Sequence, residues 1–257
     1  MCHDLDSRPP IPPLAGAAVD GKRIELEAAD GARFMAFDAQ AAVSATRAGM
    51  IILPDVRGLH RFYEELALRF AERGIDAMAI DYFGRTARSA DRGDDFEAVP
   101  HVEQAHYETL MLDAAAAVEH LRSRGTAHVF SIGFCFGGRL AFVTSARPEL
   151  GLAGVIGFYG PPTGPGRAGT PAPLDLARTG AFRAPVLGLF GGADEGIEEE
   201  SIEALSGALT DAGVENELVI YPGAPHSFFD RKAADFADAA ADAWGKVQEF
   251  VERKPAE

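Results

Sequence analysis

Residues 127–138 form the segment that most constrains how this chain can fold. A β-prone run ends at Gly133, a helix-compatible run begins at about Phe136, and Cys135 lies on the turn between them. This layout is typical of a nucleophile elbow, a sharp strand-to-helix turn with a glycine two residues away on either side of the reactive side chain. Here the pattern is Gly133-x-Cys135-x-Gly137. Because the helix dipole and the first free N–H groups favour a thiolate, we predict a reactive cysteine rather than an inert buried thiol.

A nucleophile of this kind needs a base and a carboxylate that orients the base, in the chain order nucleophile, carboxylate, histidine. Asp194 follows the β-prone run 184–190, and His226 follows the run 217–221. Both lie just past the carboxyl end of a predicted strand, at the edge of a parallel sheet where sites assemble. Singly, the aspartate could cap a helix and the histidine could be a surface residue. Together with Cys135, the order favours a catalytic triad.

The chain resembles the dienelactone hydrolase family, whose cysteine-dependent members have the α/β-hydrolase fold. The likeness extends from about Gly49 to the C-terminus and rests on three motifs: Gly133-Phe134-Cys135-Phe136-Gly137-Gly138, Gly191-Gly192-Ala193-Asp194 and Pro225-His226-Ser227-Phe228. The resemblance implies that Cys135 is the nucleophile, His226 the base and Asp194 its orienting residue. It also implies an esterase or lactonase that works through a thioester.

The remaining pattern predicts a mostly parallel central sheet with helices on both faces and an antiparallel hairpin at the N-terminal edge. Asp30-Gly31, between two β-prone runs, is suited to a tight hairpin turn, and the apolar run 48–53 is typical of a strand buried on both faces. We expect an extended, proline-rich arm at residues 1–20 and a single domain over residues 21–257.

Apolar periodicity predicts helices, and glycine-rich stretches predict loops near the site. The expected helices cover residues 62–72, 103–124, 202–209 and 236–251. Residues 83–100 lack periodicity, as a lid or a disordered loop would, and residues 161–173 form an irregular Gly/Pro-rich loop that should overhang the site.

The segment after the strand at residues 48–53 supplies further candidates. In this fold the backbone N–H groups after this strand and after the nucleophile form the oxyanion hole, which we assign to Val56 and Phe136. By resemblance, Asp55 matches, one methylene shorter, the glutamate that holds the family's resting thiol in an inactive pose. The alternative is that Asp55 only caps the following turn.

Four arginines are candidates for binding a substrate carboxylate. Arg57 is close in sequence to the oxyanion-hole residues, and Arg85 and Arg92 lie on the loop at residues 83–100. In the family, an arginine four residues after the histidine helps to bind this carboxylate. Here that position is Asp230 and the arginine is Arg231, which puts the diene-lactone substrate in doubt. Arg85 and Arg92 could instead be solvated, and Arg231 could face solvent or pair with Asp230.

The composition of the chain limits the kinds of partner that it can bind. A net charge of −15, with no run of Lys or Arg, argues against nucleic acid and anionic membranes. Two cysteines give no disulfide framework, and Cys2-His3-Asp4 is an isolated terminal group rather than a metal site. We expect no metal or organic cofactor, a small ester or lactone as substrate, a monomer or homodimer, and a cytoplasmic location, because the N-terminus lacks a signal-peptide layout.

Other functions stay open at this point. A general carboxylesterase or thioesterase of the same fold would have the same triad. A glutamine amidotransferase also uses an elbow cysteine, but its carboxylate lies two residues after the histidine, and that position here is Phe228. A non-catalytic binding or redox-sensing protein could have kept the pocket.

Overall fold

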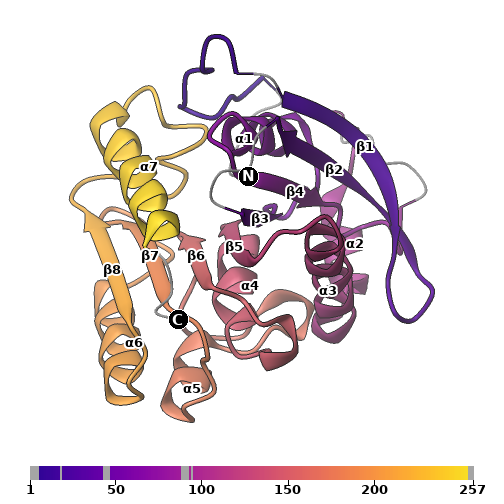
Figure 1. Ribbon diagram of the computed structural model, residues 1–257. Helices are drawn as coiled ribbons and strands as arrows, with labels where there is room; N and C mark the ends of the chain where they lie inside the picture. Colours follow the sequence, from indigo (N-terminus) through magenta and orange to yellow (C-terminus); the bar gives the residue numbers. More distant parts are fainter. Residues whose placement is uncertain (1–5, 18, 43–46, 88–92, 94, 254–257) are drawn as a thin grey trace.

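The computed structural model describes residues 6–17, 19–42, 47–87, 93 and 95–253. Within these residues the centre of the molecule is one sheet of eight strands (Figure 1). The strands are β1 (Val19–Glu27), β2 (Arg33–Ala41), β3 (Ala48–Leu53), β4 (Asp76–Ile80), β5 (His128–Phe134), β6 (Gly154–Phe158), β7 (Val186–Gly191) and β8 (Asn216–Tyr221).

The strand order across the sheet is β1-β2-β4-β3-β5-β6-β7-β8. β2 pairs antiparallel with β1 and β4, and every pair from β4 to β8 is parallel. All residues of β3, β6 and β7 are buried, as expected of parallel strands covered on both faces. The predicted mostly parallel sheet with an antiparallel edge hairpin is confirmed.

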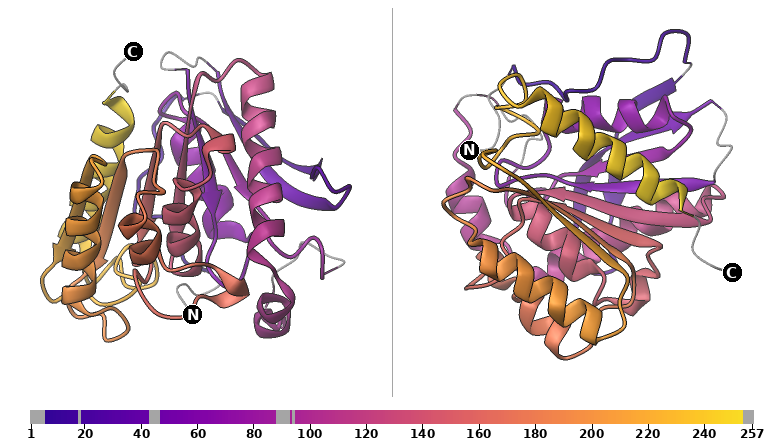
Figure 2. Two further views of the ribbon diagram at one scale, coloured as in Figure 1. Left: turned by 90° about the horizontal axis from the view of Figure 1, so that it is seen from below. Right: turned by 90° about the vertical axis from the view of Figure 1, so that its left-hand side faces the viewer.

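Helices cover both faces of the sheet, because each carries an apolar stripe that packs on it. In Figure 2, α1 and α7 lie on one face, and α3, α4 and α6 lie on the other. The ring centroids of Phe70 on α1 and Trp244 on α7 are 5.0 Å apart. The helices are α1 (Arg61–Ala71), α2 (Ala98–Gln104), α3 (Tyr107–Ser123), α4 (Phe136–Thr144), α5 (Pro173–Arg178), α6 (Glu199–Asp211) and α7 (Ala237–Glu252), with 3₁₀ turns η1 (Pro148–Leu150) and η2 (Arg167–Gly169).

One helix prediction is wrong. The single helix expected over residues 103–124 is two helices, α2 and α3, which meet at Ala105 and His106, both in extended conformation. The bend leaves Val102 and Ala105 buried in the same hydrophobic cluster as Leu110, while α2 also contacts η2. Because the chain has no Gly or Pro there, tertiary packing and not local sequence sets the break.

The proline-rich segment lies against α1. Ile11 is buried in the main hydrophobic cluster, and Arg8 forms an ion pair of 3.1 Å with Glu65 of α1. β1 begins at Val19, close to the boundary expected between arm and domain. The division into an arm and a single domain stays a prediction.

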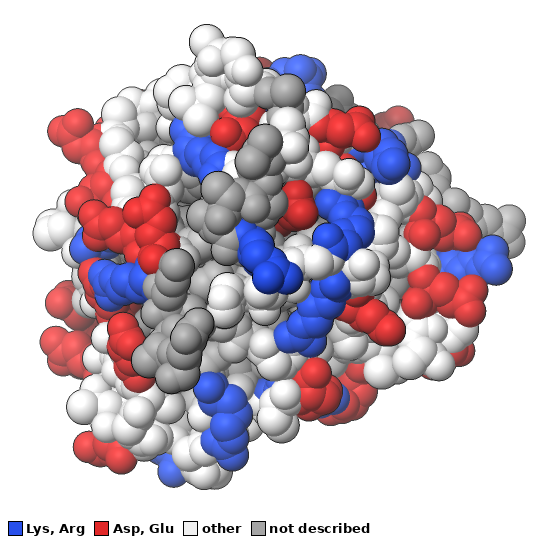
Figure 3. Space-filling view, viewed as in Figure 1, with Lys and Arg blue, Asp and Glu red and all other residues white. Residues whose placement is uncertain are grey.

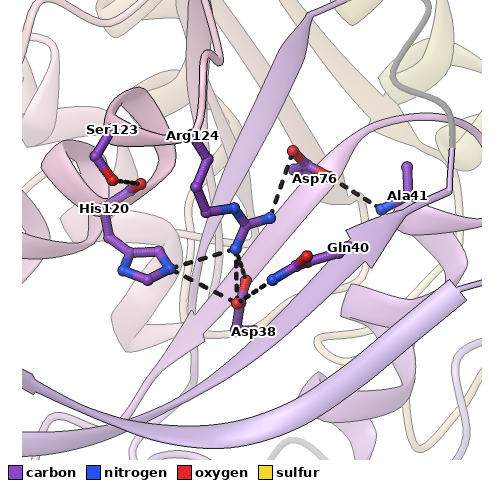
Figure 4. Close-up of polar contacts among 7 residues, drawn as sticks. All are labelled: Asp38, Gln40, Ala41, Asp76, His120, Ser123 and Arg124. Atoms are coloured by element: carbon purple, nitrogen blue, oxygen red, sulfur yellow. Dashed lines mark hydrogen bonds and ion pairs between the residues drawn. The ribbon is translucent and has the colours of Figure 1, made fainter.

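A buried ionic cluster fastens α3 to the antiparallel edge of the sheet (Figure 4). Asp38 on β2 is 1% exposed, and Nη1 of Arg124 lies 2.6 Å from each of its carboxylate oxygens. His120 Nε2 is 3.6 Å from the same carboxylate, and Arg124 Nη2 is 3.5 Å from Asp76 at the start of β4. This arginine therefore links the end of α3 to two neighbouring strands.

The surface in Figure 3 carries both signs of charge, with Lys and Arg interspersed among Asp and Glu rather than gathered into one continuous basic area. None of the helices in the part of the chain that the structure describes is long and apolar enough to cross a membrane.

We expect Arg124→Ala to lower the free energy of unfolding by about 3 kcal/mol, because it leaves the Asp38 carboxylate buried without its main counter-charge. Chemical denaturation would measure the loss. The control is Arg61→Ala, which breaks the exposed Arg61–Glu65 pair and should cost about 0.5 kcal/mol or less. Equal losses in the two variants would contradict a structural role for the buried cluster.

Candidate active site

The elbow predicted between β5 and α4 is present. Cys135 caps the N-terminus of α4 with φ 55° and ψ −111°, a strained conformation for a residue with a side chain. Its N–H donates to the carbonyl of Phe158, at the end of β6, at 3.0 Å. The turn therefore holds the sulfur at the carboxyl end of the sheet, beside the amino end of a helix.

Two glycines permit this turn because the backbone passes very close to its neighbours. A β-carbon on Gly133 would lie 1.9 Å from the carbonyl oxygen of Gly137, and one on Gly137 would lie 2.0 Å from that of Leu53. Neither distance is compatible with any side chain larger than hydrogen. The G-x-C-x-G spacing is thus a packing requirement of the site.

The structure brings the predicted acid and base together. Asp194 follows β7 and His226 follows β8, and His226 Nδ1 is 2.5 Å from Asp194 Oδ2. The other oxygen of Asp194 accepts the Gly196 N–H at 3.0 Å, so the carboxylate is held from both sides. A bond of this kind fixes the tautomer and the direction of the imidazole.

The electrostatics link the base to the thiol. Burial disfavours a charged His226, but hydrogen bonds with Asp194 and Cys135, together with their charges, outweigh burial and raise the pKa of the imidazole to about 10. This rise favours the imidazolium at neutral pH. An imidazolium beside a cysteine favours the thiolate, which is the nucleophilic form.

A cavity of about 250 Å³ opens beside Cys135. Val56 and Phe136, the two residues predicted to form an oxyanion hole, both line it. Phe136 is the first residue of α4, so its N–H has no carbonyl one turn earlier to bond. A further part of the lining comes from residues 161–173, which we call the pocket loop. Its lining residues are Pro161, Thr163, Gly164, Pro165, Gly166 and Arg167.

Asp55 is fully buried in the segment that carries Val56. One carboxylate oxygen accepts the Arg57 N–H at 2.9 Å, and the backbone N–H of Asp55 donates to the hydroxyl of Tyr63 at 3.0 Å. The bond to Arg57 is that of a turn cap, as the alternative interpretation expected. Burial raises the pKa of Tyr82, with added contributions from the charges of Asp55 and Cys135, so both groups act on the same tyrosine.

The four candidate arginines occupy different environments. Arg57 is 6% exposed, and among the described residues its guanidinium makes one long hydrogen bond, 3.4 Å to the carbonyl of Gly93. Arg85 forms ion pairs with Asp30 (2.6 Å) and Asp113 (2.8 Å). Arg231 is exposed. Arg92 lies outside the described residues.

Sequence reasoning missed a buried pair behind the base. Tyr159, at φ 39° directly after β6, donates its hydroxyl to Asp230, and its ring centroid is 4.7 Å from that of His226. Burial raises the pKa of Asp230 to about 8 and the charge of Asp55 adds to the rise, while hydrogen bonds from Tyr159 and from the Arg231 N–H oppose it. The one feature of the sequence that could have pointed to this pair is Asp230, an acid at the position where the family has an arginine.

Comparisons with known proteins identify the family of this chain. The model of the Dienelactone hydrolase family matches residues 35–254. The chain belongs to the dienelactone hydrolase family. It is therefore a hydrolase of the class that acts on ester or lactone bonds.

Relatives of the family cover most of the chain. A carboxymethylenebutenolidase of Rhodococcus opacus is 29% identical over 263 residues, which cover 98% of this chain and 97% of that protein. A protein of Methylorubrum extorquens is 30% identical over 214 residues, 78% of this chain and 70% of its own.

Solved structures share the fold. A structure from Klebsiella pneumoniae superposes with a TM-score of 0.78 at 23% identity and covers 92% of this chain and 99% of that one. A dienelactone hydrolase-like promiscuous phosphotriesterase from metagenomic libraries gives a TM-score of 0.70 at 24% identity, with 93% and 100% covered.

We expect the pKa of His226 to fall from about 10 in both Cys135→Ala and Asp194→Asn, because each removes a hydrogen bond and a charge that stabilise the imidazolium. The imidazolium should then be lost at lower pH than in the wild-type protein. NMR titration of the ring would measure this, with the resonance assigned through His226→Gln.

Cys135→Ser is the matched control, since a hydroxyl can keep the hydrogen bond but carries no thiolate charge; its shift should be smaller than that of Cys135→Ala. An unchanged titration in Cys135→Ala would show that the thiol does not interact with the base.

Proposed function

We propose that this member of the dienelactone hydrolase family cleaves a small ester or lactone through a Cys135–His226–Asp194 triad and a thioester intermediate. The observation that carries the proposal is the convergence of the three side chains at the ends of β5, β7 and β8, beside a cavity of about 250 Å³. A glutamine amidotransferase, which also uses an elbow cysteine, would need its carboxylate at the position of Phe228.

In the first half-reaction the thiolate of Cys135 attacks the ester carbonyl carbon, and the carbonyl electron pair moves to oxygen. The N–H groups of Val56 and Phe136 are the proposed donors to this oxyanion. When the intermediate collapses, the bond to the leaving oxygen breaks and the imidazolium of His226 supplies its proton. The products are an alcohol, or the opened lactone, and an acyl thioester on the sulfur.

In the second half-reaction the neutral imidazole takes a proton from water, whose oxygen attacks the thioester carbonyl. The carbon–sulfur bond breaks, the thiolate leaves and the acid is released, so the thiolate and imidazolium are restored. Asp194 holds Nδ1 of the ring throughout, which leaves the other nitrogen for these transfers.

The glutamine amidotransferase alternative is weakened by Phe228, the residue two positions after His226. It is fully buried and packs on Tyr159 and Tyr221, so it cannot stand in for a carboxylate. A general carboxylesterase or thioesterase of this family remains compatible with the same chemistry. The cytoplasmic location and the absence of a cofactor stay predictions from the sequence.

Alkylation of Cys135 by iodoacetamide should abolish hydrolysis in a panel of small esters, lactones and thioesters, because the thioester can no longer form. Peptide mass spectrometry would locate the adduct and separate it from Cys2. Cys135→Ala should show the same loss without reagent. Full activity after stoichiometric alkylation of Cys135 would end the cysteine-hydrolase proposal.

Among the arginines, we propose Arg57 as the one that binds a substrate carboxylate. Arg57 directly follows the cavity-lining Val56 in the chain, it is 6% exposed, and within the described residues no acid forms an ion pair with it. Buried cations normally have an anionic partner, which a substrate could supply here. Arg85 already has two such partners.

Arg57→Ala should raise KM for an anionic ester by about ten- to a hundredfold, the equivalent of about 1.5–3 kcal/mol, and change KM for a neutral ester of similar size much less. Steady-state kinetics on the matched pair of esters would measure the ratio. Arg231→Ala is the control, because that side chain is exposed and should leave the ratio unchanged. A shift of the ratio in Arg231→Ala alone would move the role to that residue.

A further inference from the structure

Arg139 lies on α4, one turn after Cys135, and its buried guanidinium hydrogen-bonds to main-chain carbonyls. It is 4% exposed, and within the described residues no carboxylate hydrogen-bonds to it. Its backbone N–H donates to the carbonyl of Cys135 at 3.1 Å. Four of the five N–H donors of its guanidinium go to main-chain carbonyls: Thr163 (2.8 Å), Gly164 (2.7 Å), Thr170 (3.1 Å) and Pro171 (3.2 Å).

These four acceptors lie on the two limbs of the pocket loop. Thr163 and Gly164 are on the outgoing limb, and Thr170 and Pro171 are on the returning one, so one side chain closes the loop on itself. The space between the limbs is minimal: a β-carbon on Gly166 would lie 2.1 Å from the carbonyl oxygen of Thr170 and 2.9 Å from Nε of Arg139. The loop conformation therefore depends on this guanidinium.

The outgoing limb of the same loop is a wall of the cavity that contains Cys135. Arg139 also lines that cavity, so it joins the wall directly to the helix that carries the nucleophile. At about 250 Å³ the space is smaller than sites that enclose drug-sized ligands, which measure roughly 300–1,000 Å³. The position of the wall sets how large a group fits beside the sulfur.

We propose that Arg139 is a specificity-determining positioning residue: by holding the two limbs of the pocket loop beside Cys135, it restricts the pocket to small substrates. This inference rests on the proposed ester or lactone hydrolysis at Cys135. Arg139 acts through the loop and takes no part in proton transfer. Its loss leaves these four carbonyls, of which that of Thr170 is bonded in a buried position, without their donors and lets the wall move outward.

The first test is Arg139→Lys, assayed on p-nitrophenyl acetate, butyrate and octanoate. A lysine has three donors on a flexible stem and cannot bond four carbonyls at once. We expect the octanoate-to-acetate ratio of kcat/KM to rise by about tenfold, equivalent to about 1.4 kcal/mol, mainly through KM of the longer ester. For acetate, kcat should stay within about threefold of wild type, because the triad is untouched.

The matched control is Arg122→Lys. Arg122 also donates to loop carbonyls, those of Leu150 and Gly151 at 2.7 Å each, but it does not line the cavity at Cys135. This variant should keep the wild-type ratio. An equal change of the ratio in both variants, or a uniform loss of kcat in Arg139→Lys, would overturn the proposal in favour of a purely structural role.

The second test does not require hydrolysis. The rate of Cys135 alkylation by iodoacetamide is compared with its rate with N-(1-pyrenyl)maleimide, by mass spectrometry of the Cys135 peptide. Arg139→Lys should raise the bulky-to-small rate ratio, and Arg122→Lys should not. If no ester is cleaved, the proposed function fails, yet this ratio still decides whether Arg139 limits access to the sulfur.

Gly166→Ala keeps the proposal testable if Arg139→Lys does not fold. The added methyl group must displace the Thr170 carbonyl or Arg139 itself, so it disturbs the loop while the arginine remains. The alkylation ratio should shift in the same direction as for Arg139→Lys. A wild-type ratio in a folded Gly166→Ala protein whose pocket loop has moved would overturn the proposal.

Discussion

The close contact between the amino end of α4 and the carboxyl ends of β3 and β6 is the constraint on which this site depends. A β-carbon on Gly137 would lie 2.0 Å from the carbonyl of Leu53, and one on Gly138 would lie 2.3 Å from that of Phe158. The helix begins between these two strand ends, and its first residue, Phe136, lines the same cavity as Val56. The strained backbone of Cys135 is the cost of this approach, and the hydrogen bond to Phe158 helps to hold it.

Near this contact, the local charge differs in sign from the net charge of the chain. The chain carries −15, yet Arg139 lines the cavity beside Cys135, and among the described residues its guanidinium hydrogen-bonds to main-chain carbonyls and to no carboxylate. A guanidinium buried beside the cavity gives a local positive charge, opposite in sign to the net charge of the chain. The net charge of the chain is therefore a poor guide to the charge of the substrate. The hydrogen-bond and ion-pair partners of each arginine are a better one.

Much of the fold, and the meeting of Cys135, Asp194 and His226 at one edge of the sheet, could be predicted because the decisive signals are local. Cys135, Asp194 and His226 each follow a run of apolar residues that reads as a strand, and parallel strands deliver their ends to one edge. The break at Ala105, the four acceptors of Arg139 and the bond between Tyr159 and Asp230 could not be predicted, since each depends on where distant segments pack. Arg85 illustrates the same limit: its position in the chain suggested the pocket, but its partners are Asp30 and Asp113.

Cys135 and His226, the nucleophile and the base of the proposed mechanism, come from segments far apart in the chain, and this separation has a consequence during synthesis. Cys135 leaves the ribosome well before His226, which lies beyond β8. Until the last strand has joined the sheet, the thiol lacks the imidazole that is proposed to activate it. If the mechanism is as proposed, the growing chain carries an ordinary cysteine, and the reactive form arises only once the C-terminal third has folded.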